Sequence, residues 1–258
     1  MNVISIDEYT VRARLAPAVI AVMPAFAFAA IFVSWGKLGL PHVIASLGLM
    51  ILFAAFSDIA RRRGRKIEPG LIAKMGGLPS TTMLRHRDDS FDAGTKAKVH
   101  AFLASKLVAP APSAAQETAD PKAADDWYAR GGTWLRENTR DTRKFRLLFN
   151  ENISYGFRRN LLGLRMPGLL LNVAIVLTCA GVLAYRWPID LDNYFNDALI
   201  AVIAASAIHA AYLSLAVTED SVFDAARLYA RQLILSVEKL DKVPTTTTTT
   251  RSRVTKQS

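Results

Sequence analysis

Hydrogen-bond donors cluster in one polar stretch of the sequence, residues 74–96 (KMGGLPSTTMLRHRDDSFDAGTK). Hydroxyl, guanidinium, imidazole and ammonium groups lie close together here, on Thr81, Thr82, Arg85, His86, Arg87 and Lys96. Planar guanidinium groups bind phosphate through two parallel hydrogen bonds, and hydroxyl groups complete such a cradle. The stretch is therefore a candidate for binding an anionic ligand, such as a phosphorylated small molecule, although a structural role for the loop is the favoured interpretation.

Three other interpretations of this loop stay open. Asp88 and Asp89 would make it a salt-bridged structural element if they paired with the two arginines. His86 with Asp88 or Asp89 would carry acid–base catalysis in a membrane-bound enzyme. The same residues with His100 would surround a metal, although their spacing matches no familiar set of ligands. The favoured interpretation has no catalytic residue, no metal and no cofactor, since kinase, P-loop and zinc-protease patterns are missing.

The apolar part of the sequence holds few polar side chains, and His209 and Asn172 stand out among them. Burying an ionisable group in a bilayer costs from about 2.5 kcal/mol upward, so such groups usually have a function. A proton-coupled transporter would show acidic residues or several histidines there, and this sequence does not. We expect His209 to be a neutral, hydrogen-bonded packing residue, with a pore-lining or proton-relay role as the alternative.

Four charge-free runs of 20 to 22 residues are the elements that must position these groups: 15–36, 38–57, 166–185 and 198–218. An α-helix rises about 1.5 Å per residue and crosses a hydrocarbon core of about 30 Å in about 20 residues. The predicted fold class is therefore all-α, a polytopic membrane protein with four transmembrane helices in two hairpins, 15–57 and 166–218. Pro24 removes a hydrogen bond within the first span, where we expect a bend.

The distribution of positive charge predicts the orientation, because cationic flanks of membrane spans stay in the cytoplasm. Arg12 and Arg14 precede the first span. RRRGRK (61–66) follows the second span, and RRNLLGLR (158–165) precedes the third. Residues 58–165 carry 21 Lys and Arg against 12 Asp and Glu. We expect both termini and this segment on the cytoplasmic side of a bacterial inner membrane, next to anionic lipid headgroups. Nucleic acid is not expected as a partner, because no nucleic-acid-binding motif accompanies the charge.

The cytoplasmic segment 58–165 is expected to be mostly helical. An Ala- and Pro-rich stretch within it, 105–126, is typical of a flexible linker. Asp120 before Pro121 predicts the start of a helix, because it combines a capping oxygen with a preset backbone angle. The aromatic and basic residues between 144 and 165 favour an interfacial helix on the inner leaflet.

The ends of the chain are assigned separately. Residues 1–14 contain the start of a cytoplasmic helix, and 219–242 form a cytoplasmic amphipathic helix. An apolar stripe runs along the latter at helical spacing: Val222, Ala226, Tyr229, Leu233, Val237 and Leu240. This stripe is expected to pack either against the cytoplasmic segment or against copies of itself, the latter giving a homo-oligomer. Residues 243–258, with six consecutive threonines, are expected to be disordered.

Three segments of the chain carry a resemblance: GGLPSTTMLRHRD (76–88), GTKAKVHAFLA (94–104) and ENTRDTRKFRLLFNENISYGFRRNLLGLR (137–165). With the flanking hairpins, they resemble a group of uncharacterised bacterial four-helix integral membrane proteins. The resemblance implies an inner membrane location and brings no established activity.

The function expected is non-enzymatic. The cytoplasmic segment is expected to bind an anionic ligand or a protein partner. One version of this function is a small effector protein that perturbs the membrane after binding. One alternative is a passive membrane anchor or scaffold for a cytoplasmic complex. The other is the membrane-bound enzyme that uses His86 and Asp88.

Overall fold

The computed structural model describes residues 7–32, 42–190 and 192–242, and every regular element within these ranges is a helix. The all-α fold class predicted from the sequence is therefore confirmed. Two predicted features lie outside the described residues, namely the end of the first span together with its turn, and the tail at 243–258.

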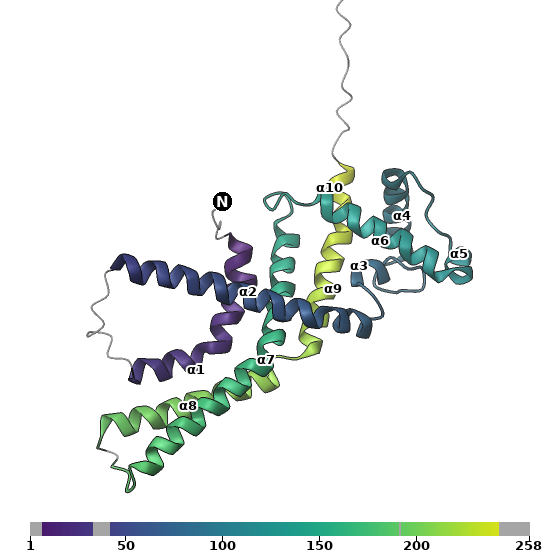
Figure 1. The fold of residues 1–258 in the computed structure, drawn as a ribbon. Coiled ribbons are helices and arrows are strands. Elements are labelled where there is room, and N and C mark those ends of the chain that lie inside the picture. Colours follow the sequence, from purple (N-terminus) through teal and green to yellow (C-terminus); the bar gives the residue numbers. More distant parts are fainter. Residues whose placement is uncertain (1–6, 33–41, 191, 243–258) are drawn as a thin grey trace, which may run out of the picture.

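The helices are connected mostly by short turns (Figure 1). In chain order they are a π-helical segment η1 (Thr10–Leu15), α1 (Ala16–Phe32), α2 (His42–Lys74), α3 (Pro79–Thr82), α4 (Ala93–Leu107), α5 (Ala114–Ala119), α6 (Pro121–Asn138), α7 (Arg146–Tyr185), α8 (Tyr194–Leu215), α9 (Glu219–Leu235) and α10 (Val237–Asp241). In Figure 1, α8, α1 and the first part of α2 extend to one side, while α3–α6 and α10 gather on the other.

Three described helices are long and apolar enough to cross a membrane: Thr10–Ala29, Arg146–Tyr185 and Tyr194–Leu215. α2 is also long, but most of its side chains before Ala54 lie outside the described residues. The structure thus supports three of the four predicted spans. The fourth span and the arrangement in two hairpins stay predictions.

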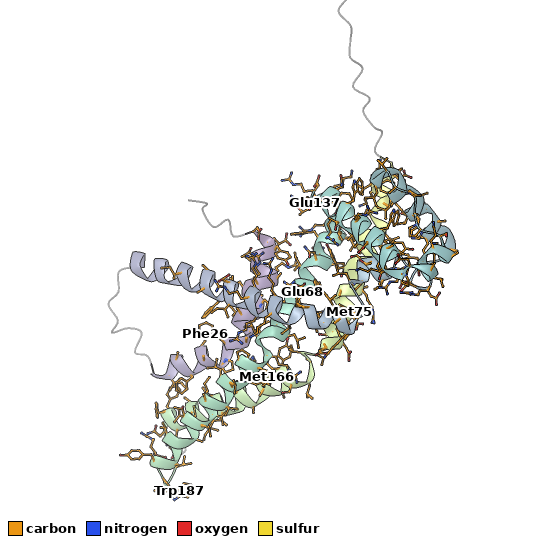
Figure 2. The ribbon with its side chains drawn as sticks, turned by 45° about the vertical axis from the view of Figure 1, so that its right-hand side comes forward. Phe26, Glu68, Met75, Glu137, Met166 and Trp187 are labelled. Atoms are coloured by element: carbon orange, nitrogen blue, oxygen red, sulfur yellow. The ribbon has the colours of Figure 1, made fainter. Side chains whose placement is uncertain are left out.

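Exposed apolar side chains distinguish the second half of α7 from a helix of a water-soluble protein. Four of them are each more than half exposed and recur every three or four residues: Met166, Leu170, Val173 and Leu177. A large apolar surface of this kind favours contact with lipid over contact with water. Beyond it lie three exposed aromatic residues of the type that settles at a membrane–water interface: Tyr185, Tyr194 and Trp187, the last of which is labelled in Figure 2.

α7 is one uninterrupted helix of 40 residues, so the predicted interfacial helix at 144–165 is not a separate element. This segment continues into the apolar half, and α7 packs against η1, α2 and α9. One face of it is buried in the protein at Ile153, Gly156 and Asn160. Contact of its other residues with the inner leaflet stays a prediction. The axis of α7 changes direction near Met166, next to Pro167 (Figures 1 and 2).

One hydrophobic core joins α4, α6, the start of α7, α9 and α10, and α3 and α5 pack against α6. We call these elements the globular domain. Its largest fully buried side chains are Leu84, Leu103, Tyr128, Leu135, Leu233 and Ile234. The residues 58–165 and 219–242, predicted as separate parts, therefore contribute to the same core. α2 likewise continues through residue 57 to Lys74, so no structural break separates the second span from the following charged residues.

The apolar stripe of α9 and α10 packs against the rest of the same chain. Val222, Ala226, Leu233 and Val237 are buried, and Tyr229 and Leu240 are partly buried against the core of the globular domain. The sequence allowed this stripe to pack against the cytoplasmic segment or against a second copy of the protein. In the structure it packs against the same chain. The predicted use of these six residues for self-association is therefore corrected, because the stripe is not available to a second copy.

The segment 105–126, predicted as a flexible linker, is instead an ordered part of the globular domain. It contains α5, whose first turn is closed by a capping box between Ser113 and Gln116. The helix start predicted at Asp120 and Pro121 is confirmed, since the Asp120 side chain accepts a hydrogen bond from the N–H of Ala123 at 3.0 Å.

Glycines allow α2 and α7 to approach each other closely. A methyl group on Gly163 would lie 2.6 Å from the backbone carbon of Arg63, and one on Gly64 would lie 2.1 Å from Oδ1 of Asn160. Contacts this short are not possible for a real side chain. The crossing of α2 and α7 therefore depends on hydrogen atoms at these two positions.

This crossing predicts that Gly163→Ala destabilises the protein, because the new methyl group meets backbone atoms that cannot move aside. We expect a loss of about 1–3 kcal/mol in the free energy of unfolding, measured by denaturant or thermal unfolding in detergent. Gly181→Ala on the same helix is the matched control, since a methyl group there meets nothing within 4 Å. Equal stability of the two variants would contradict the close crossing.

Candidate functional site

The predicted anion-binding loop lies in the globular domain, between the end of α2 and the start of α4. Arg85 is held in place by hydrogen bonds of its guanidinium group. Nε and Nη2 of Arg85 donate to the two carboxylate oxygens of Asp125, each at 2.8 Å, and Nη2 also donates to the carbonyl of Gly76 at 3.2 Å. The carboxylate of Asp125 raises the pKa of Arg85 above its usual value. The guanidinium group is thus engaged by a neighbour from α6.

Lys96 closes the loop from the other side. Its side chain is buried, and its ammonium group donates to the carbonyl of Arg85 at 2.7 Å, to that of Asp88, and to that of His86 at 3.5 Å. A buried ammonium group is stable only where such acceptors compensate for lost water. Lys96 therefore fixes the turn that follows α3.

Glu117, which the sequence analysis did not single out, is the acidic centre of this region. It is 3% exposed and accepts hydrogen bonds from the N–H of His86 at 2.7 Å and from the hydroxyl of Tyr128 at 2.8 Å. Nε of Arg87 lies 3.9 Å from its other oxygen. Burial alone would raise the pKa of Glu117, but the hydrogen bonds from His86, Tyr128 and Arg87 outweigh it and hold the pKa below its usual value.

The two histidines of the loop lie side by side, with ring centroids 5.0 Å apart. Nε2 of His100 is 2.8 Å from the carbonyl of Leu84, and Nε2 of His86 is 2.8 Å from the carbonyl of Pro112. A carbonyl only accepts, so both Nε2 atoms carry a proton. Burial of His100 lowers its pKa, which keeps the ring neutral at pH 7.

These contacts do not support the interpretations of the loop as a catalytic site or as a metal site. His86 is held by a carbonyl, whereas the Asp88 carboxylate accepts from the N–H of Ser90 at 2.8 Å. Among the described residues, no group of three or more His, Cys, Asp or Glu side chains is placed to hold a metal ion.

The six residues predicted to bind an anion are thus brought together, but mainly to satisfy one another and the backbone. Thr81 is buried, and the Thr82 hydroxyl lies 3.5 Å from the carbonyl of Pro79. Of the six residues, only His86 and Arg87 are exposed. The arrangement is close to the salt-bridged alternative, except that Asp125 and Glu117 replace Asp88 and Asp89 as the acidic partners.

A second polar site lies among the apolar helices, where the structure brings His209 and Asn172 into contact. Nδ1 of His209 lies 3.0 Å from Nδ2 of Asn172, and Nε2 lies 2.8 Å from the carbonyl of Ile20. Pro24, four residues after Ile20, has no N–H to donate to this carbonyl. His209 therefore supplies the hydrogen bond that the proline removes from α1.

The same arrangement recurs one heptad earlier. Pro17 has no N–H for the carbonyl of Ala13, and Nδ2 of Asn160, whose side chain is 1% exposed, donates to that oxygen at 2.6 Å. Asn160 was not among the residues predicted from the sequence. The available signal was two prolines seven residues apart in one helix, which predicts two carbonyls in need of donors from other helices.

Both contacts hold the N-terminal helix against α7 and α8. The Nε2–H form of His209 donates to Ile20, and its Nδ1 accepts from Asn172, so a neutral ring satisfies both neighbours. This geometry matches the packing role expected for His209. A third polar contact joins α2 to α7, where Arg159 lies 2.7 Å from Glu68 and the hydroxyl of Tyr155 donates to the same oxygen at 2.8 Å (Figure 2).

Comparison with known proteins gives no relative to set beside this geometry: no protein-family model, no curated protein and no solved structure matches the chain.

Burial of His100 predicts that acid destabilises the globular domain. Because its pKa is lower in the folded than in the unfolded chain, the unfolded chain binds a proton first as pH falls below about 6.5. Stability is then lost by at most about 1.4 kcal/mol per pH unit until the folded-state pKa is reached. We expect the midpoint of denaturant unfolding to fall between pH 7.5 and 5.5, above the range in which Glu117 titrates.

His100→Gln is the matched variant, because its amide still donates to the carbonyl of Leu84 but does not titrate. It should lose less stability than the unmodified protein between these two pH values. The same loss in both proteins would show that another group is responsible.

The proline contacts predict a specific coupling in the free energy of unfolding. His209→Ala should destabilise the protein by about 0.6–1.7 kcal/mol, the range of hydrogen bonds between membrane helices. The loss should be smaller in the Pro24→Ala background, because a backbone N–H then reaches the carbonyl of Ile20. Pro17→Ala is the control background and should leave the effect of His209→Ala unchanged, since Pro17 removes the helical donor of the Ala13 carbonyl and not that of Ile20. Additive effects of His209→Ala and Pro24→Ala would refute this role of His209.

Proposed function

We propose that the protein is a non-enzymatic anchor of a bacterial inner membrane, which holds its globular domain at a fixed position on the cytoplasmic face for a cytoplasmic partner. The observation that carries this proposal is the continuity of α7. At about 1.5 Å per residue, its 40 residues measure about 60 Å along the bent helix axis, twice the hydrocarbon core of a bilayer. One half is therefore available to the membrane and the other to the globular domain.

The packing around α7 supports a stiff connection. Its apolar half packs against α8 and α1, and its polar half packs against η1, α2 and α9. α9 in turn contributes Leu233 and Ile234 to the core of the globular domain. A domain joined in this way keeps its height and orientation relative to the spans, which is the property that a scaffold requires.

The placement in the cytoplasm rests on charge. The net charge of the chain is +10, and residues 58–165 contribute 21 basic against 12 acidic side chains. Positive segments next to spans are retained on the cytoplasmic side.

Two other functions considered from the sequence receive less support from the contacts. A membrane-perturbing effector that assembles through the α9 stripe needs that stripe on the surface, whereas it is buried in the chain. An enzyme that uses His86 and Asp88 needs the two side chains to act together, whereas each is held by a different backbone group. A partner of the globular domain meets Arg87 and His86, which are exposed on the loop.

The proposal predicts a narrow distance distribution between the globular domain and the far end of the α7–α8 hairpin. Spin labels at Lys98→Cys and Asp192→Cys, in a Cys179→Ala background, would report it by double electron–electron resonance in nanodiscs. Three residues, Gly-Gly-Ser, inserted after Arg165 should broaden the distribution. The same insertion after Ala111, in the α4–α5 connection, should not. A broad distribution in the protein without an insertion would contradict the rigid anchor.

The side of the membrane is tested separately. A fluorescent protein fused to the C-terminus should fold and fluoresce at the membrane, whereas alkaline phosphatase fused there should stay inactive. An active phosphatase fusion would place the globular domain outside the cytoplasm and would overturn the proposal.

A further inference from the structure

A groove of about 520 Å³ lies where η1, the first half of α7 and the α8–α9 junction meet. Its α7 residues, from Asn150 to Leu161, lie in the polar half, which continues into the apolar half at Met166. Its wall combines basic, polar and apolar side chains, and those that matter here are Arg12, Asn150, Phe157, Arg158, Leu161 and Tyr212.

The charge of the groove is positive. Two arginines line it and no carboxylate does. Among the described residues, the hydrogen bond of Arg158 is a long one of 3.4 Å to the carbonyl of Ser221. Arg12 pairs with Glu8 at 2.8 Å, but Glu8 also binds Arg146, so one carboxylate is shared by two guanidinium groups. The groove thus keeps donors and positive charge for an anion.

One of the lining residues, Asn150, carries a polar atom without a partner in the described ranges. Oδ1 of Asn150 is buried and accepts no hydrogen bond within the described part of the chain. An unpaired buried acceptor costs about 1–3 kcal/mol, so a ligand hydroxyl that donates to it would be favoured. Next to it, Ile153 and Leu161 are buried and form an apolar floor with Phe157.

We propose that this groove binds one anionic phospholipid whose headgroup carries a hydroxyl, of the phosphatidylglycerol type. The phosphate meets Arg158 and Arg12, and the headgroup hydroxyl donates to Asn150. The acyl chains follow Phe157, Leu161 and Tyr212 toward the apolar half of α7 and α8. Basic pockets between membrane helices on the cytoplasmic side recognise anionic headgroups in this way. A free phosphate would leave the apolar floor unused, so the lipid is the better match.

Lipid binding to the full chain in mild detergent tests the proposal, with native mass spectrometry and thermal unfolding as readouts. Short-chain phosphatidylglycerol should bind at one molecule per chain and raise the unfolding temperature. Phosphatidylcholine of the same chain length, glycerol 3-phosphate and inorganic phosphate are the comparison ligands, and each should bind at least tenfold more weakly. Equal binding of phosphatidylcholine, or binding of phosphate alone, would overturn the proposal.

Arg158→Gln should weaken the binding of phosphatidylglycerol about tenfold, because it removes a charge-assisted hydrogen bond. Arg62→Gln is the matched control: its side chain is 79% exposed, it lies on α2 outside the groove, and it loses the same charge. An equal, small effect of both variants would indicate general attraction to anionic lipid and would refute a built site.

Asn150→Leu separates the headgroup contact from the charge. It should reduce the preference for phosphatidylglycerol over phosphatidic acid, which has no headgroup hydroxyl, and should leave phosphatidic acid binding unchanged. An unchanged preference would refute the contact with the hydroxyl. Unfolding without lipid shows whether each variant is folded before its binding is compared.

Discussion

The continuity of α7 is the constraint on which the rest of the structure depends. η1, α1, α2, α8 and α9 all pack along this one helix, so it fixes both the apolar bundle and the position of the globular domain. α2 and the α8–α9 junction also connect the two regions along the chain. The close approach of Gly163 to the backbone of α2 shows how tightly its neighbours are held.

Unsatisfied polar groups explain much of what packs against α7. The prolines in the N-terminal helix leave the carbonyls of Ala13 and Ile20 without their helical donors, and Asn160 and His209 replace those donors. An unpaired carbonyl in an apolar environment is costly, so each contact specifies which helix faces which. In the globular domain, Glu117 has the same role for the backbone of the loop at His86. In both regions, polar groups give the packing its specificity and apolar surface provides most of its stability.

Parts of the fold and of the sites could be predicted because they depend on neighbouring residues. The lengths of the apolar runs at 166–185 and 198–218, and the helix start at Asp120 and Pro121, are properties of short segments. The loop at 74–96 was found from its composition, but its acidic partners were not. Asp125 lies 40 residues from Arg85, and Glu117 lies 31 residues from His86. No local pattern indicates pairs so distant in the sequence.

The sequence by itself determined that this chain is helical and contains long apolar helices, because helical period and hydropathy act over one or two turns. Only the tertiary structure decided that the α9 stripe is covered by its own chain, that 105–126 is ordered, and that 146–165 belongs to α7. An apolar stripe on a helix predicts that this face is buried, but it does not indicate which surface covers it. That partner is selected by the packing of the whole chain.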